Sequence, residues 1–233
     1  MYSVTAAAAL RKVNPTMMTT IRTRGFLYLV GTLVNKLVPE RVFRFRIFRI
    51  FELEEIDLDA NAGRSQANAP RAHELMFRWC ETEAEIADAC RLTFFRPDGS
   101  GAPQQACLAI ANSEPVGGVW IGRDYFNETE LGLRICLNED QTWLFSAFVE
   151  KQHRRTGVYR RLLNHVLADQ QQTVFASINP TNKASIKSHS PYIRRTAGTC
   201  VAVRCFGWSK CWASGQLRVD GNEITILAYT ESN

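Results

Sequence analysis

One short stretch in the second half of the chain limits the available folds more than any other. Residues 143–149 form the apolar run WLFSAFV, and a basic turn with one glycine, Gly157, follows it. Apolar residues then recur at helical spacing, as Leu162, Leu163, Val166 and Leu167. The pattern predicts a strand that enters a helix through a basic turn. The start of a helix offers unpaired N–H groups and a partial positive charge, and Arg154 and Arg155 add full charges, so the stretch predicts a phosphate site.

The segments around this stretch predict an α+β domain. Residues 73–80 are strand-like, and Thr82 with Glu85 forms the capping-box pattern of a helix that continues to Leu92. A hairpin is expected at 105–121. Further strands are expected at 131–137, 173–178, 199–208 and 222–229, a polar loop at 124–130, and a short helix at 183–189. This order predicts a mixed, mostly antiparallel sheet flanked by helices, in which the two strands on either side of the main helix run parallel.

Residues 1–72 are predicted to form an N-terminal extension to a domain that occupies residues 73–233. Apolar residues at helical spacing predict a helix over 21–37. Val42 to Leu53 read as a strand with three arginines, and the small, polar residues 60–72 make the best linker candidate. We interpret the helix as one that packs on the domain, with a helix that lies on a membrane surface or a partner as the alternative.

Two motifs resemble those of the GNAT superfamily of N-acetyltransferases. Val149 is followed by four residues and then by Arg154-Arg155-Thr156-Gly157-Val158-Tyr159, and Leu162 comes after two more. This is similar to the family's Val, then Arg/Gln-x-x-Gly-x-Gly/Ala, then Leu. Downstream, Asn182-Lys-Ala-Ser185 looks like the family's Asn-x-x-Ala/Ser element. The resemblance implies a GNAT-like (acyl-CoA N-acyltransferase) fold from about residue 73 to residue 229, with a helix–strand extension before it.

The sequence departs from the family pattern in three places. Tyr159 stands where the family usually has Gly or Ala, and Arg155 where Gly is common. The Gly-Phe pair that follows the second motif in the family is missing, and residues 191–198 occupy that region. The bulk of Tyr159 is compatible with a phosphate site if its side chain points away from the phosphates, because the binding groups there are backbone N–H donors.

The resemblance also implies which residues hold an acetyl-coenzyme A or another acyl-coenzyme A. Ala147, Phe148 and Val149 would offer main-chain groups to the pantetheine arm, which lies along a splayed strand. Asn182 would hydrogen-bond the arm, and Ser185 would pack beside it. The pyrophosphate would be cradled by the turn and the helix start, through Arg154, Arg155, Thr156, Gly157, Val158 and Tyr159.

The reaction implied is direct attack of an amine on the thioester. His189 lies seven residues after Asn182, where many members carry the tyrosine that protonates the leaving thiolate, and an imidazole can do this at neutral pH. Its alternative is a structurally bonded histidine. Glu128 is a candidate base, with a solvated charge as the alternative. Ser146 is a candidate for the oxyanion site or a water chain.

The amino-acid composition limits the kinds of ligand and the cellular compartment that are expected for the chain. The net charge of +5, from 28 Lys and Arg against 23 Asp and Glu, suits an anionic ligand but does not indicate nucleic acid. The chain has seven cysteines without a C-x-x-C pair, which indicates buried thiols in a reducing compartment and no metal site. No secretory pattern is evident, so a cytoplasmic location is expected.

Three functions are compatible with these patterns. The first is an N-acetyltransferase that acts on a small-molecule amine or a protein amine. The second is a long-chain acyl transferase that accepts its acyl group from an acyl-carrier protein. The third is an inactive module that binds coenzyme A or a partner. A contact with a membrane surface or an acyl carrier would use residues 26–38, and a homodimer is a further expectation.

Overall fold

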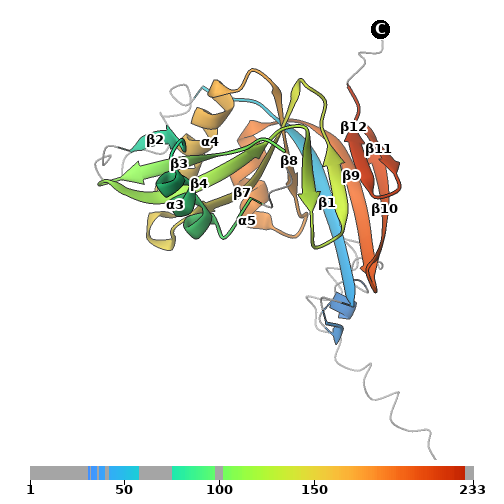
Figure 1. Cartoon of the computed structure of the whole chain (residues 1–233). Helices are drawn as coiled ribbons and strands as arrows, with labels where there is room; N and C mark the ends of the chain where they lie inside the picture. Colours follow the sequence, from blue (N-terminus) through green and yellow to red (C-terminus); the bar gives the residue numbers. More distant parts are fainter. Residues whose placement is uncertain are drawn as a thin grey trace, which may run out of the picture.

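The computed structural model describes residues 31, 33–35, 37–39, 42–57, 75–97 and 102–228, and its centre is an eight-stranded sheet (Figure 1). The strands are β1 Phe43–Leu53, β2 Met76–Trp79, β3 Gln104–Ala111, β4 Glu114–Gly122, β7 Gln141–Val149, β8 Thr173–Ile178, β9 Ile193–Cys205 and β10 Trp208–Gly215. Their order is β10-β9-β1-β8-β7-β4-β3-β2. Only β7 and β8 run parallel in this sheet, which confirms the predicted parallel pair and the mixed, mostly antiparallel sheet.

A second, four-stranded sheet covers part of one face of the first. It consists of β5 Tyr125–Glu128, β6 Leu133–Cys136, β11 Leu217–Asp220 and β12 Glu223–Ile226, in the order β11-β12-β6-β5. The prediction of a polar loop at 124–130 was wrong, because Tyr125 to Glu128 pair with β6. The strand has only four residues, YFNE, and all four are half-buried, so it shows no alternation of apolar and polar residues and the sequence pattern resembled a loop.

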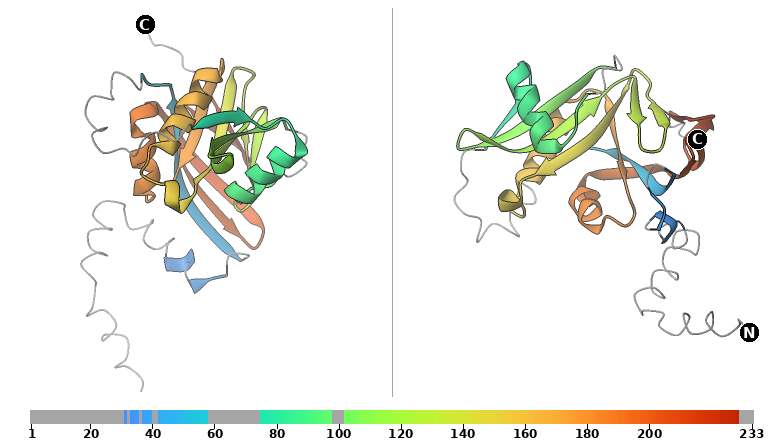
Figure 2. Two further views of the ribbon diagram at one scale, coloured as in Figure 1. Left: turned by 90° about the vertical axis from the view of Figure 1, so that its left-hand side faces the viewer. Right: turned by 60° about the horizontal axis from the view of Figure 1, so that its bottom comes forward.

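The helices lie on both faces of the large sheet (Figure 2). They are α3 Glu83–Thr93, α4 Val158–Asp169 and α5 Lys183–His189, with the short 3-10 turns η3 Lys151–His153 and η4 Ser190–Tyr192. The predicted capping box of α3 is confirmed: Thr82 Oγ1 accepts from the Glu85 N–H, and the Glu85 carboxylate accepts from the Thr82 N–H. Among the described residues, none of the helices is both long and apolar enough to cross a membrane.

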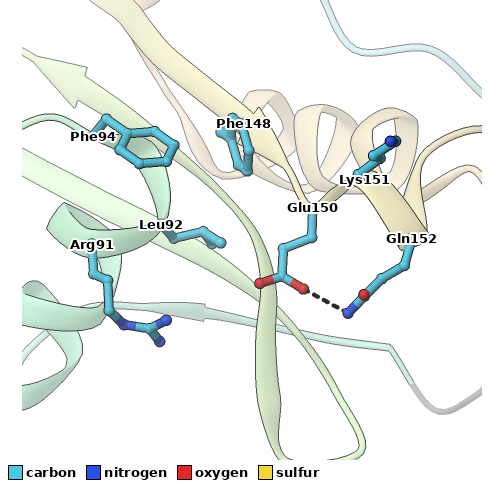
Figure 3. Close-up of a pocket in the computed structure, with 7 residues that line it drawn as sticks. All are labelled: Arg91, Leu92, Phe94, Phe148, Glu150, Lys151 and Gln152. Carbon is cyan, nitrogen blue, oxygen red and sulfur yellow. Dashed lines mark hydrogen bonds between the residues drawn. The ribbon is translucent and has the colours of Figure 1, made fainter.

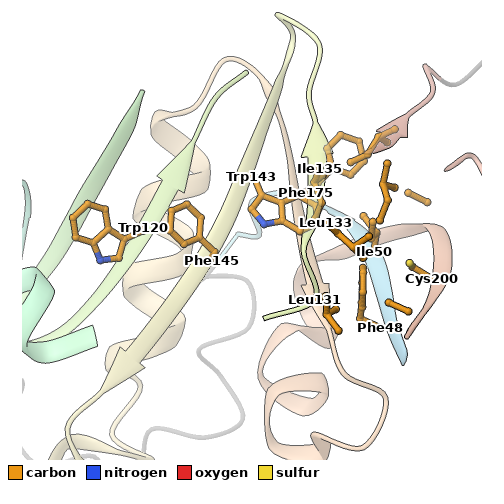
Figure 4. Close-up of a cluster of buried hydrophobic side chains, with 14 of the residues drawn as sticks. Phe48, Ile50, Trp120, Leu131, Leu133, Ile135, Trp143, Phe145, Phe175 and Cys200 are labelled. Carbon is orange, nitrogen blue, oxygen red and sulfur yellow. The ribbon is translucent and has the colours of Figure 1, made fainter. Parts of the chain in front are cut away.

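Two hydrophobic cores lie on the two faces of the sheet. The first joins α3 and the second sheet to the large sheet, and it buries Trp120 and Trp143 almost completely (Figure 4). The second lies under α4, whose apolar stripe of Val158, Leu162, Leu163, Val166 and Leu167 is buried. The helical spacing predicted for this stripe is therefore confirmed, and the sheet between the two cores fixes the position of the turn before α4.

The predicted strand at 42–53 lies inside the large sheet. It forms β1, which pairs with β9 on one side and with β8 on the other. The ladder between β1 and β8 begins only at Arg49, so β8 does not reach Phe45. There the Asn35 side chain takes the place of a strand: it donates to the Phe45 carbonyl oxygen and accepts from the Phe45 N–H. The division at residue 72 stays a prediction, but the sheet takes strands from both sides of it. The predicted linker at 60–72 lies outside the described residues.

The predicted closing strand at 199–208 was wrong in its bounds. The structure has a longer hairpin instead, with β9 from Ile193 to Cys205 and β10 from Trp208 to Gly215. Phe206 and Gly207 form its two-residue turn, and both have positive φ. The turn lacks Asn and Asp, so the sequence signal for a tight hairpin was weak.

Candidate active site

The candidate site begins where β7 parts from β8. Ladder pairs join the two strands from Gln141–Thr173 to Leu144–Ala176 and go no further. Beyond them β7 stays paired with β4 up to Val149, while β8 stays paired with β1 up to Ile178. A wedge therefore opens between the two parallel strands, and no strand of the described chain pairs with this edge of β7 at residues 145–149.

A β-bulge at Ser146 coincides with the start of the wedge. Trp120 of β4 pairs with Phe145 and Gly118 pairs with Phe148, so two residues of β7 face one of β4. Ser146 has φ of 48°, in the left-handed region. A bulge of this kind bends a strand and re-aims the side chains around it. Ser146, Ala147 and Phe148 are consequently half-buried or exposed, whereas Val149 is buried again.

The turn after β7 folds back on the strand. Arg154 Nε donates to the Val149 carbonyl oxygen at 2.9 Å, and its guanidinium lies 5.3 Å from the centre of the Phe148 ring. Thr156 Oγ1 donates to the His153 carbonyl oxygen at 2.6 Å. Arg155 and Gly157 both have positive φ, and both are exposed. The turn is thus held by its own contacts, and Arg155 projects a charge into solvent beside the helix start.

The start of α4 is compatible with an anionic ligand. Gly157 is the N-cap residue, and no side chain caps the first N–H groups of the helix. A Cβ placed on Gly157 would meet no heavy atom within 4 Å, so the space in front of the helix start is open. The N-terminus of a twelve-residue helix attracts anions through its N–H groups and its dipole. Residues 154–159 therefore fit the predicted pyrophosphate cradle in backbone geometry.

Tyr159 and His189 form a side-chain contact between α4 and α5 that the sequence did not suggest. The Tyr159 hydroxyl lies 2.7 Å from His189 Nε2, and the two rings meet edge to face at 5.4 Å. His189 Nδ1 lies 2.8 Å from the Ser185 carbonyl oxygen. A carbonyl only accepts, so Nδ1 carries the hydrogen, and Nε2 accepts from the Tyr159 hydroxyl. The side chain of Tyr159 therefore points to α5 and away from the open space at Gly157.

The chemistry of this pair follows from its burial. His189 is only 6% exposed, and burial lowers the pKa of its imidazole, although the hydrogen bond to Ser185 acts in the opposite direction. Burial likewise raises the pKa of the Tyr159 hydroxyl. Both groups are therefore neutral near pH 7. When the Tyr159 oxygen takes up a proton from a neighbouring group, it can pass its own proton to Nε2, so the oxygen stays neutral and the positive charge forms on the imidazole.

The structure does not bring all the predicted residues together. Asn182 caps α5, because its Oδ1 accepts from the Ser185 N–H at 3.0 Å. Glu128 lies in the second sheet, with Arg46 of β1 at 3.9 Å. Burial raises the pKa of the Glu128 carboxyl more than Arg46 lowers it. The charges around Glu128 thus belong to β1 and the second sheet rather than to the turn before α4.

A pocket of about 500 Å³ opens beside the end of β7, on the side of α3 (Figure 3). Phe94 and Phe148 meet there edge to face, with ring centres 5.5 Å apart. The Glu150 carboxylate faces the same space and accepts from Gln152 Nε2 at 2.9 Å. Arg91, Leu92 and Lys151 complete the lining. Sequence reasoning missed this pocket, since its residues come from the end of one helix and the end of a strand that is distant in the chain.

Comparison with known proteins gives one family. The model of the acetyltransferase (GNAT) family matches residues 69–190, about half of the chain. No curated protein matches the chain by sequence.

Solved structures give weaker likenesses. A conserved protein of unknown function from Staphylococcus epidermidis has a TM-score of 0.43 at 14% identity, over 80% of this chain and 66% of that one. A putative GNAT acetyltransferase from Novosphingobium aromaticivorans has a TM-score of 0.42 at 9% identity, over 70% and 66%. A ribosomal-protein-alanine N-acetyltransferase from Brucella melitensis has a TM-score of 0.36 at 17% identity, over 52% and 92%. The chain spans just under two thirds of the first two proteins.

Proposed function

The chain belongs to the acetyltransferase (GNAT) family, and we propose that it transfers an acetyl or other acyl group from an acyl-coenzyme A to a primary amine. The observation that carries this proposal is the parting of β7 from β8 directly before an uncapped helix start. An open strand edge suits an arm that contains amide groups, and the helix start suits a pyrophosphate. A coenzyme A carries both on one molecule, and its thioester supplies the acyl group.

The binding roles follow from the main chain. Residues Ala147, Phe148 and Val149 would offer the amide groups of the β7 edge to the pantetheine arm. The N–H groups at the start of α4 would receive the pyrophosphate, with Arg155 as an exposed charge in the turn. Arg154 instead fixes the turn, because its Nε is already bonded to the Val149 carbonyl oxygen.

Proton transfer is assigned to Tyr159 and His189 together. The neutral imidazole accepts at Nε2 from the Tyr159 hydroxyl, so a proton that arrives at the tyrosine oxygen is matched by transfer of the hydroxyl proton to Nε2. The reverse movement returns a proton from His189 to a group in contact with the tyrosine oxygen. Ser185 holds the ring in the required tautomer through its carbonyl oxygen. His189 thus acts through Tyr159, and the serine is a positioning residue.

The pocket beside Phe148 is our candidate for the acceptor. It combines two aromatic rings, from Phe94 and Phe148, with the Glu150 carboxylate. Aromatic faces and a carboxylate attract an ammonium group, whereas Arg91 and Lys151 in the same lining suit a negatively charged group elsewhere on the acceptor. Phe148 belongs to both the pocket and the β7 edge, so an acceptor there lies next to the proposed acyl arm.

Ligand-induced stabilisation tests the proposal. At about one hundred times its dissociation constant, a ligand stabilises the native state by about 2.7 kcal/mol. For a chain of this size we expect acetyl-coenzyme A to raise Tm by about 5–10 °C. ATP, which has a polyphosphate but no pantetheine arm, is the matched control and should give a much smaller shift. Equal shifts would mean a general phosphate site, and no shift with any acyl-coenzyme A would contradict the proposal.

A thiol-release assay then separates the enzyme from a binding module. Acetyl-coenzyme A is incubated with a panel of amines that spans amino acids, polyamines, amino sugars and peptide N-termini, and free thiol is measured. Release that depends on one class of amine identifies the acceptor class. A clear shift in Tm without release across the panel would favour the binding module, and a much larger shift with long-chain acyl-coenzyme A would favour a lipid-type donor.

A further inference from the structure

The tip of the β9–β10 hairpin carries a large apolar side chain in an unfavourable position. Cys205 pairs with Trp208, so Phe206 and Gly207 alone form the turn. Phe206 has φ of 48°, and its side chain is 81% exposed. Asn, Asp or Gly is preferred at this place in a tight hairpin, because other residues are strained there. Neither local structure nor core packing accounts for a phenylalanine at this position.

The outer face of β10 continues the apolar surface. Trp208 is 63% exposed and Trp212 is 54% exposed, with Lys210 between them on the same face. Beside them on β9 lie Val201 and Val203, which are half-buried. The opposite face of the hairpin holds the buried side chains of Cys200, Ala202 and Cys211, which belong to the core under the second sheet. The two tryptophans therefore contribute little to the core.

The charges on this outer face have one sign. By strand register, this side of the sheet carries Trp208, Lys210, Trp212 and Ser214 of β10, Thr199, Val201, Val203 and Cys205 of β9, and Phe43, Phe45, Ile47 and Arg49 of β1. Two of these residues are basic and none is acidic. Phe45 is buried there against Gly31, so the exposed part of this face lies on β10 and β9. The neighbouring acids, Glu128 and Glu130, pair with Arg46 on the other face. Within the described part of the chain, Lys210 forms no ion pair.

The hairpin tip also lies next to the end of the N-terminal helix. The Phe206 N–H donates to the Val42 carbonyl oxygen at 2.9 Å, directly before β1. Leu37, in the described helical residues just before it, is 75% exposed. Figure 1 shows both segments at the same end of the long strands. Two apolar surfaces from different parts of the chain are therefore available at one end of the molecule.

We propose that this end of the molecule docks on an anionic lipid surface. Phe206 enters the boundary between headgroups and acyl chains, Trp208 and Trp212 lie at headgroup level, and Lys210 contacts lipid phosphates. Aromatic residues with polar edges collect at membrane interfaces, and lysine keeps its charge at headgroup level while its stem covers apolar surface. A lipid surface fits better than a protein partner, because the aromatic side chains alternate with a lysine along one edge strand and form no pocket. The inference is independent of the proposed reaction.

The test uses the full chain and vesicles of phosphatidylcholine with or without phosphatidylserine. We expect co-sedimentation with the anionic vesicles and quenching of tryptophan fluorescence by brominated lipid. Phe206→Asn should lower the vesicle partition coefficient about tenfold, because it removes the inserted ring. The same substitution suits the left-handed turn, so Tm should not fall. Lys210→Glu should weaken binding to the anionic vesicles about tenfold or more and have little effect on the neutral ones.

Phe94→Asn is the matched control for this experiment. Phe94 also has positive φ and is 82% exposed, but it lies at the end of α3. It should leave vesicle binding unchanged. The proposal is overturned if the protein stays in solution with anionic vesicles, or if Phe206→Asn and Phe94→Asn bind equally well. It is also overturned if Phe206→Asn dissociates a dimer in sedimentation velocity without changing vesicle binding, because the face would then be an interface between two copies of the chain.

Discussion

Replacing Tyr159 by Phe isolates the hydroxyl that joins α4 to α5. The phenyl ring retains the packing and the edge-to-face contact, while His189 Nε2 loses its donor at 2.7 Å. His189 is almost fully buried, so an unsatisfied nitrogen there costs about 1–3 kcal/mol of unfolding free energy. In a chain of this length that corresponds to a fall in Tm of about 2–12 °C.

The effect on turnover should be larger than the effect on stability. A positioned proton-transfer group contributes about 10²–10⁴-fold, so we expect kcat to fall at least about a hundredfold. KM for the acyl-coenzyme A should change little, since the proposed binding groups are backbone N–H donors. Steady-state kinetics at saturating amine, followed by thiol release, measures both constants. Denaturant unfolding of the same preparations measures the loss of stability.

Tyr192→Phe is the control for a lost buried hydroxyl. Tyr192 is fully buried, and its hydroxyl donates to the Arg160 carbonyl oxygen at 2.6 Å, on the same helix as Tyr159. We expect a loss of about 1 kcal/mol of stability with kcat preserved. If Tyr159→Phe keeps full kcat, or if both variants lose kcat to the same degree, the assignment of proton transfer to Tyr159 and His189 is wrong.

Two further predictions concern the helix start and the buried histidine. Gly157→Ala should lower the unfolding free energy by about 1 kcal/mol, because an alanine is strained at this positive φ although its Cβ would contact no other atom. Gly157→Glu should in addition weaken acyl-coenzyme A binding about ten- to a hundredfold by charge repulsion, as measured by calorimetry. Equal affinities for the two variants would place the phosphates elsewhere. The pKa of His189 is lowered in the folded state, so as pH falls below the unfolded value of 6.5 the unfolded chain binds a proton first. As pH falls from 6.5 to the pKa of His189 in the folded state, the unfolding free energy should therefore decrease by up to about 1.4 kcal/mol per pH unit. His189→Gln should lack this contribution when urea unfolding is measured at several pH values. Identical pH dependence of the two proteins would show that His189 titrates normally.

Local features of the fold were predictable from the sequence. The capping box of α3 depends on two residues three positions apart, and the buried stripe of α4 depends on its spacing of apolar residues. The position of β1 depends on pairings with strands more than a hundred residues away. The alternation of side chains shows which face of a strand is buried but not which strand lies beside it. The sequence therefore could not show that the strand in residues 1–72 lies between β8 and β9.

The same difference between local and long-range features applies to the candidate site. The turn and the helix start at 154–159 form one continuous segment, and the motif located it. The wedge between β7 and β8 follows from where two ladders end, which depends on β4 and β1 as well. The contact between Tyr159 and His189 joins two helices, and it explains how a large residue is accommodated at a position where the family usually has a small one. The sequence required only that the Tyr159 side chain point away from the phosphates, and it did not indicate His189 as the contact.

The central place of β1 has a consequence for biosynthesis. This strand leaves the ribosome before its partners β8 and β9, which are translated more than a hundred residues later. Until then its phenylalanines and isoleucines have no sheet to join, and an unpaired apolar strand on a nascent chain is prone to aggregate. The sheet can therefore be completed only after β8 and β9 have left the ribosome. An expression fragment cut to the family-matched residues 69–190 would lack β1, which pairs with β8 on the side away from β7, and β9, which pairs with the other edge of β1.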